Sequence, residues 1–174
     1  CAYDIINAEY IRDLKAGEVI QIDEEVIRTG EVKSFFIDKK NETKHCIFEY
    51  IYFSRPDSTI FGNTVDKVRR KLGKNLSIEK PAPKANIEDK KVVVISVPDS
   101  SNTAALGYVT ETIKSNPYVK LELGLIRSHY IGRTFIQPGQ DNREIKVKAK
   151  FNTVKSVLKD RIVVIVDDSI VRGT

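Results

Sequence analysis

The end of the chain carries the strongest constraint on the fold. An uninterrupted apolar run, 162–166, leads directly into two adjacent carboxylates, Asp167 and Asp168, and then into the turn 169–174. A continuous Val/Ile run is typical of a strand buried on both faces of a parallel sheet, where ligands bind beyond the carboxyl ends of the strands. The carboxylates can accept hydrogen bonds from ribose hydroxyls, while backbone N–H groups of the turn can bind a phosphate. Taken alone, the segment also fits a strand end whose Asp pair binds a metal or only begins a turn.

Strand and helix patterns alternate along most of the chain. We expect strands at 45–53, 91–97, 118–123 and 161–166, and helices at 64–79, 103–113 and 146–158. Residues 18–28 alternate in polarity around Asp23 and predict a hairpin. The regular alternation of strands and helices predicts an α/β fold with a parallel sheet flanked by helices.

The two clearest helices carry recurring apolar or small residues. In the first, apolar residues recur at helical spacing, namely Val65, Val68, Leu72 and Leu76. In the second, small residues predict close packing on the sheet, namely Ala104, Ala105 and Gly107.

A second strand end resembles the first in its position. The turn 98–101 follows the strand 91–97, just as the Asp pair follows the strand 161–166. Both can therefore face one crevice of a parallel sheet. By itself the turn also fits an ordinary helix cap.

Several segments together resemble one enzyme family. VIVDDSIVRGT, 164–174, resembles the phosphoribosyl pyrophosphate loop of type I phosphoribosyltransferases, in the wording of the glutamine amidophosphoribosyltransferase family. FEYIYFSRPDS at 48–58, VPDSS at 97–101 and YIGRTFIQPGQ at 130–140 resemble the same family in the same order, as does the segment from CAYD at 1–4 to AEYIR at 8–12. The resemblance covers essentially the whole chain and is weakest at about 24–43 and 80–90.

The resemblance implies a chain that is an internal fragment. Residues 1–43 would be the end of an N-terminal-nucleophile glutaminase domain with connecting strands. Residues 44–174 would be the N-terminal part of a type I phosphoribosyltransferase domain, truncated on its C-terminal side. The absence of Met agrees with this expectation. We expect the fragment alone to be inactive, because its phosphate loop is cut.

The family's reaction is a glycosyl transfer. The resemblance implies that ammonia derived from glutamine attacks C1 of 5-phosphoribosyl 1-pyrophosphate, giving 5-phosphoribosylamine and pyrophosphate at the first step of purine (IMP) biosynthesis. Asp167 and Asp168 would hold the ribose hydroxyls and stabilise the cationic C1. Mg²⁺, which prefers oxygen ligands, would bind Ser100, Asp167 and Asp168.

The resemblance also assigns residues to binding and to a lid. The lid, which excludes water over the activated sugar, would carry the catalytic candidates Tyr130, Arg133 and Lys148. The substrate-binding candidates lie in the pyrophosphate turn and the 5′-phosphate loop, namely Pro98, Asp99, Ser100, Ser101, Ser169, Ile170, Val171, Arg172, Gly173 and Thr174.

Charge is concentrated in one segment. The chain has a net charge of +5, and residues 127–161 alone carry +6. Nucleic acid, a polyanionic small molecule and solvent are all possible partners of such a segment. Its loop-like composition and its resemblance to the family's lid favour pyrophosphate. The alternatives are a phosphoribosyltransferase-fold regulator that binds nucleic acid, and a different phosphoribosyltransferase, which would lack the 48–58 and 130–140 motifs.

The two cysteines carry little independent information. They do not build a disulfide framework, and no apolar run approaches the roughly 20 residues of a membrane span, so we expect a cytoplasmic protein. Cys46 stands where some family members bind a [4Fe-4S] cluster and others do not, and it fits equally a small buried hydrophobic residue. Cys1 matches the end of the glutaminase domain, so we expect no catalytic role for it.

Partners follow from the resemblance as well. It implies phosphoribosyl pyrophosphate, ammonia or glutamine through the missing domain, and purine nucleotides as inhibitors. We expect a homo-oligomer at full length, with neither nucleic acid nor membrane as a partner.

Overall fold

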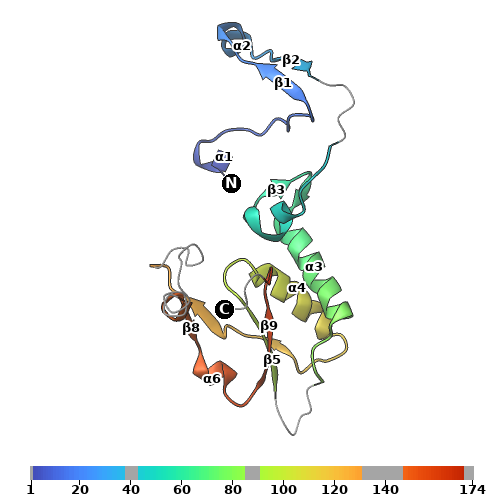
Figure 1. Cartoon of the computed structure of the whole chain (residues 1–174), viewed down its shortest axis with the longest axis vertical. Coiled ribbons are helices and arrows are strands. Elements are labelled where there is room, and N and C mark those ends of the chain that lie inside the picture. Colours follow the sequence, from blue (N-terminus) through green and yellow to red (C-terminus); the bar gives the residue numbers. More distant parts are fainter. Residues whose placement is uncertain (1, 38–42, 85–90, 131–146, 171–174) are drawn as a thin grey trace. The chain divides into compact units, whose positions relative to one another are not determined.

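The computed structural model describes residues 2–37, 43–84, 91–130 and 147–170 (Figure 1). The chain divides into two compact units, Cys1–Ile47 and Phe48–Thr174. The assignment of residues 1–43 to a glutaminase domain and of 44–174 to a transferase domain stays a prediction. Within the described ranges, none of the helices combines the length and apolar character that crossing a membrane requires.

The first unit is a small antiparallel hairpin with a helix inserted in it. Its elements are α1 (Ala2–Ile5), β1 (Glu18–Gln21), α2 (Glu24–Thr29) and β2 (Lys33–Phe36). The hairpin predicted within 18–28 is therefore wrong in extent, because β1 pairs with β2 beyond that range. Asp23 caps α2 and accepts a hydrogen bond from the Val26 N–H at 3.0 Å. An Asp at this position satisfies a helix donor that would otherwise lack a partner, so the chain enters a helix here.

The second unit holds the α/β core. Its elements are η1 (Glu49–Phe53), β3 (Thr59–Ile60), β4 (Asn63–Thr64), α3 (Val65–Glu79), β5 (Val92–Ser96), α4 (Asn102–Thr112), β6 (Lys120–Leu121), β7 (Leu125–Arg127), β8 (Phe151–Thr153), α6 (Lys155–Leu158) and β9 (Ile162–Val166). The helices predicted at 64–79 and 103–113 and the strands predicted at 91–97 and 161–166 are confirmed to within one residue at each end.

Three other predicted elements differ from the structure. The strand predicted at 45–53 is wrong, because residues 49–53 form the π-helical turn η1. A buried arginine, Arg69, donates to the carbonyls of Tyr50 within this turn and of Ser54 directly after it. The helix predicted at 146–158 contains a strand, β8, because this segment pairs with β7. The strand predicted at 118–123 is reduced to the two residues of β6.

A parallel three-stranded sheet in the order β6-β5-β9 forms the centre of the second unit (Figure 1). β5 is the middle strand, and its Val93 lies opposite Lys120 of β6 and Val163 of β9. The chain leaves β5 through α4 to reach β6 on one side and later returns as β9 on the other side. The predicted α/β fold with a parallel sheet is therefore confirmed.

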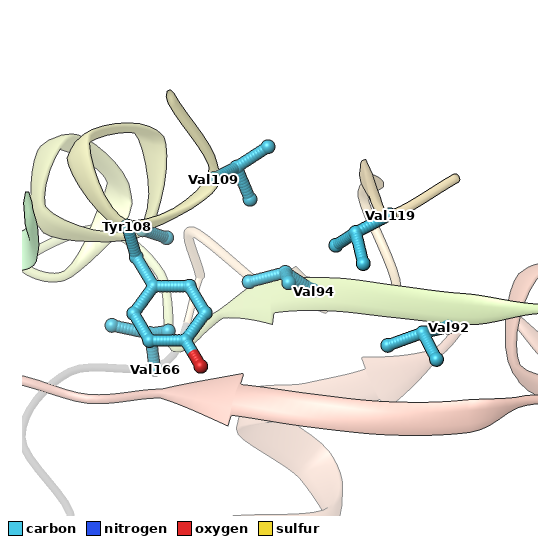
Figure 2. Packing of buried hydrophobic residues seen from close by; sticks show 7 residues of the cluster. Val92, Val94, Tyr108, Val109, Val119 and Val166 are labelled. Atoms are coloured by element: carbon cyan, nitrogen blue, oxygen red, sulfur yellow. The ribbon is translucent and has the colours of Figure 1, made fainter. Parts of the chain in front are cut away.

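The buried core lies between α4 and the sheet (Figure 2). Its members are Val92, Val94, Ala105, Tyr108, Val109, Val119 and Val166. Tyr108 is the one large aromatic ring among them, and its hydroxyl donates to the Lys80 carbonyl at 2.7 Å. Burial raises the pKa of Tyr108, because the ionised phenol would lose its hydration. The core thus satisfies the polar atom that its largest side chain carries.

Helices α3 and α4 lie side by side (Figure 1), and the leucines of α3 are not among its buried residues. Its buried residues repeat every fourth position, as Val65, Arg69, Gly73 and Ser77. Of the apolar residues that recur at helical spacing in this helix, Val65 is completely buried, whereas Leu72 and Leu76 each remain 39% exposed. Small residues replace the leucines at the contact because the two helices approach closely.

Two glycines permit that approach. A Cβ added at Gly73 would overlap the backbone carbonyl of Ala104, and one added at Gly107 would overlap the backbone carbonyl of Arg70. Gly107 therefore packs against α3, and its predicted packing on the sheet is wrong. Ser77 completes the contact, because its hydroxyl lies 2.8 Å from the Thr112 hydroxyl.

Replacing Gly107 with Ala should destabilise the protein although Ala is the better helix former. We expect the free energy of unfolding to fall by about 1–3 kcal/mol, the usual effect of forcing extra volume into a packed contact. Urea unfolding of Gly107→Ala would measure this, with Thr110→Ala, on the exposed side of the same helix, as control. The control should change stability by less than about 0.5 kcal/mol. Equal stability of the two variants would contradict the close approach.

Candidate functional site

Two strand ends meet at one edge of the parallel sheet. Ser96 at the end of β5 lies opposite Val166 at the end of β9. The N–H of Val97 donates to the Val166 carbonyl at 3.0 Å, which extends the pairing by one step. The turn 98–101 and the Asp pair that follow these strands therefore leave the sheet side by side, at the edge where such sheets bind ligands.

Hydrogen bonds join the turn to the Asp pair. Ser101, which is completely buried, donates from its hydroxyl to Oδ1 of Asp167 at 3.1 Å. The same oxygen accepts the Asp168 N–H at 2.8 Å, and the Ser169 hydroxyl donates to Oδ1 of Asp168 at 2.6 Å. One oxygen of each carboxylate is thus held by the protein. Among the described residues, neither Oδ2 accepts a hydrogen bond.

An ion pair ties the turn to strand β7. Nη1 of Arg127 donates to Oδ2 of Asp99 at 2.7 Å. The side chains are 34% and 57% exposed, respectively, so water weakens the attraction. The pair therefore matters more for geometry than for stability, because it fixes the turn relative to the strand that leads to Tyr130.

A hollow of about 190 Å³ opens beside this ion pair. Its walls include Ser96, Pro98, Asn102, Gly124, Arg127 and His129. The Ser96 hydroxyl donates to Oδ1 of Asn102 at 2.7 Å and so fixes the first residue of α4 to the end of β5. The hollow belongs to the same edge of the sheet as the turn.

A buried arginine contacts the turn from α3. The guanidinium of Arg69 donates to three backbone carbonyls, those of Tyr50 at 2.6 Å, Ser54 at 2.9 Å and Ser100 at 3.4 Å. Burial lowers the pKa of Arg69, because it removes water from the charged group, and the negative charge of Asp168 opposes this shift. A cation thus lies close enough to the Asp pair to interact with it electrostatically.

Comparison with known proteins relates this geometry to a family. No family model matches the chain. An amidophosphoribosyltransferase of Vigna aconitifolia is 45% identical over 174 residues, which is 100% of this chain and 32% of that protein. One of Methanothermobacter thermautotrophicus is 43% identical over 99% of this chain and 33% of that protein. The solved glutamine phosphoribosylpyrophosphate amidotransferase of B. subtilis, complexed with ADP and GMP, is 43% identical and superimposes with a TM-score of 0.78 over 99% of this chain. Over its whole length the chain is similar to one region of the amidophosphoribosyltransferases.

The chain spans about a third of the length of the amidophosphoribosyltransferases that it matches. A second solved structure, described as the allosteric regulatory enzyme of purine biosynthesis, gives the same picture. It is 44% identical with a TM-score of 0.76, and the chain covers 34% of it. The likeness therefore extends over the whole of this chain and over a part of each relative.

The residues predicted for an amidophosphoribosyltransferase site fall into three groups. The sheet edge brings together Pro98, Asp99, Ser100, Ser101, Asp167, Asp168 and Ser169. Three others are exposed, namely Tyr130, Lys148 and Ile170. The remaining ones lie outside the described residues, namely Arg133, Val171, Arg172, Gly173 and Thr174. The roles of all these residues stay predictions.

The oxygen-rich Asp pair fits a hard cation such as Mg²⁺. Each carboxylate keeps an oxygen that the described residues do not use, and Asp167 is exposed. The hydroxyl that contacts Asp167 is that of Ser101, while Ser100 contributes its carbonyl to Arg69. The role of Ser100 as a Mg²⁺ ligand stays a prediction.

Cys46 is exposed, so its interpretation as a small buried hydrophobic residue is wrong. In the ranges that the structure covers, no three or more His, Cys, Asp or Glu side chains gather as a metal site. The role of Cys46 as a cluster ligand stays a prediction, and Cys1 lies outside the described residues.

Two contacts of this edge were not predicted from the sequence. Arg69 is a charged residue in an amphipathic helix, and such residues usually face solvent. The sequence signal for its burial was its position. Arg69 lies four residues after Val65 and four before Gly73, on the side of α3 that is buried. The Arg127–Asp99 pair joins residues 28 positions apart, and no local pattern connects them.

Replacing Ser101 with Ala should separate the turn from the Asp pair. The variant loses a buried hydrogen bond and leaves Asp167 with one partner fewer, so we expect the free energy of unfolding to fall by about 1 kcal/mol. Ser100→Ala, one residue earlier, is the matched control and should change it by less than about 0.5 kcal/mol. Thermal and urea unfolding would compare them. A larger loss of stability for Ser100→Ala than for Ser101→Ala would contradict the hydrogen bond between Ser101 and Asp167.

Proposed function

We propose that this chain is the part of an amidophosphoribosyltransferase that binds phosphoribosyl pyrophosphate. The whole enzyme would transfer glutamine-derived ammonia to C1 of the sugar, giving 5-phosphoribosylamine and pyrophosphate at the first step of purine synthesis. The observation that supports this most directly is the hydrogen bond between Ser101 and Asp167, which unites two strand-end loops at one sheet edge. A ligand with a pyrophosphate at one end and a phosphate at the other needs two adjoining loops of this kind.

The Asp pair would act on the sugar. The available carboxylate oxygens of Asp167 and Asp168 would accept hydrogen bonds from the ribose hydroxyls. Their negative charge would stabilise C1 as it becomes cationic while its bond to pyrophosphate breaks. Because Ser101 and the Asp168 N–H hold Oδ1 of Asp167, this carboxylate is oriented before the substrate arrives. Preorganisation of this kind lowers the barrier without a cost at the moment of reaction.

The two loops would divide the phosphates between them. Residues 98–101 would bind the pyrophosphate, and residues 169–174 the 5′-phosphate. When bound, Mg²⁺ supplies positive charge to the departing pyrophosphate. Asp167, Asp168 and Ser100 are the residues proposed to hold it. Tyr130, Arg133 and Lys148 would belong to a lid that keeps water away from the activated sugar.

The partners of the whole protein are also proposals that rest on its similarity to amidophosphoribosyltransferases. The B. subtilis relative is described as complexed with ADP and GMP, so we infer that purine nucleotides bind the protein that contains this chain. A homo-oligomeric state and the supply of ammonia by a glutaminase domain belong to the same proposal. The cytoplasmic location expected from the sequence stays a prediction, since the plant relatives are named as chloroplastic.

The Asp pair provides the decisive test of this function. We expect ammonia-dependent release of pyrophosphate from phosphoribosyl pyrophosphate and Mg²⁺ by the full-length protein that contains this chain. The double variant Asp167→Asn/Asp168→Asn should lose at least about 100-fold in kcat/KM, because it removes the charge that stabilises C1. Asp160→Asn is a matched control two residues before β9, where Asn tolerates the same left-handed backbone (φ 57°).

Three outcomes separate the candidate functions. Activity that the double variant loses and the control keeps supports the transferase. A folded wild-type protein that binds the ligand without turnover contradicts it and favours a regulator. Nucleic-acid binding that weakens steeply with salt would favour the regulator as well.

A further inference from the structure

The buried guanidinium of Arg69 has no part in the chemistry described above. Arg69 is only 3% exposed. All the acceptors of its hydrogen bonds are backbone carbonyls, and no carboxylate of the described residues touches it. Burying a cation without a contacting anion is costly, so a position of this kind needs a reason beyond filling space.

The three carbonyls come from two separate parts of the second unit. Tyr50 lies within η1, Ser54 directly follows it, and Ser100 belongs to the turn between β5 and α4. Arg69 itself belongs to α3. The planar fork of a guanidinium holds several acceptors in a fixed geometry, which the single ammonium of a lysine cannot do. Arg69 therefore fixes the peptide after Ser100 relative to η1 and α3.

The turn is held on several sides. Ser101 binds it to Asp167, Asp99 binds it to Arg127, and Arg69 holds the carbonyl between these two residues. Arg69 is almost inaccessible to solvent, so screening of its positive charge by water is weak. Asp168 is the acidic residue that interacts with it electrostatically. A polyanion bound at the turn would gain from the same charge.

We propose that Arg69 is a positioning residue for the pyrophosphate turn, which fixes the Ser100 peptide and supplies a buried positive charge behind the anion. The inference rests on the proposed function, since it takes the turn as the pyrophosphate site. Arg69 does not touch the substrate in this assignment. It acts through the turn and should therefore affect affinity for pyrophosphate groups more than the chemical step.

Two substitutions separate the charge of Arg69 from its geometry. Arg69→Met removes both, while Arg69→Lys keeps the charge and loses the fork. Arg70→Met is the matched control, because Arg70 is the next residue of α3 and pairs with Asp66 at 2.7 Å with its side chain 42% exposed. All three would be made in the full-length protein and compared at a temperature where each remains folded.

The measurements are KM for phosphoribosyl pyrophosphate, kcat, and calorimetric binding of pyrophosphate with Mg²⁺. We expect Arg69→Met to raise KM and weaken pyrophosphate binding by about tenfold, the effect of losing one charge-assisted hydrogen-bonded contact. Arg69→Lys should have a KM and a pyrophosphate affinity between those of Arg69→Met and the wild type. In both variants kcat should change by less than about threefold. Arg70→Met should match the wild type in all three quantities.

The outcomes distinguish a failure of the proposed function from a failure of the proposed role of Arg69. A folded wild-type protein without turnover overturns the proposed function, while pyrophosphate binding still tests Arg69. An active wild type whose Arg69 variants bind pyrophosphate as tightly as Arg70→Met overturns the role of Arg69, even if their unfolding temperatures fall. Should the Arg69 variants not fold, the Nε–H resonance of Arg69 in the unmodified protein decides. It should shift when pyrophosphate and Mg²⁺ saturate the site, and an unchanged resonance would contradict the inference.

Discussion

The parallel pairing of β5 with β9 is the interaction on which the candidate site depends. Val92 to Ser96 of β5 lie opposite Ile162 to Val166 of β9 without an offset at either end. Because the strands run in the same direction, both following loops emerge at one edge. A slip of one residue would turn each side chain to the other face of the sheet and move Asp167 away from Ser101. The site is thus specified first by a register and only then by its charged residues.

Burial fixes that register. Val92 and Val94 of β5 are completely inaccessible to solvent, and Val166 of β9 is 3% exposed in the same core. Each buried valine contributes roughly 1.5–3 kcal/mol relative to an exposed one, so a slipped pairing would lose several such contributions together. Tyr108 of α4 packs on these valines and anchors the helix that begins directly after the turn (Figure 2). The core therefore holds the strand ends and the start of α4 as one body.

The parts that could be predicted from the sequence are those with local signals. β5 and β9 are continuous apolar runs, and both helices have apolar or small residues at helical spacing, so their bounds emerge within one residue. The segment 45–53 shows why other parts could not. Its aromatic and β-branched residues favour a strand, yet Arg69, far away in sequence, takes the carbonyls of Tyr50 and Ser54. Tertiary contacts decided the structure there. The same holds for the buried face of α3, which glycine contacts set rather than leucine spacing.

Two charged groups at this edge of the sheet are held by neutral partners. Arg69 is bound by carbonyls, and Asp167 is bound by a hydroxyl and an N–H. Had Arg69 formed a direct bidentate pair with Asp168, the two charges would have satisfied each other and left little for a ligand. Neutral partners hold these groups in place without cancelling their charge. An edge built in this way leaves carboxylate oxygens and a positive charge uncompensated, as the proposed binding of a metal, ribose hydroxyls and phosphate requires.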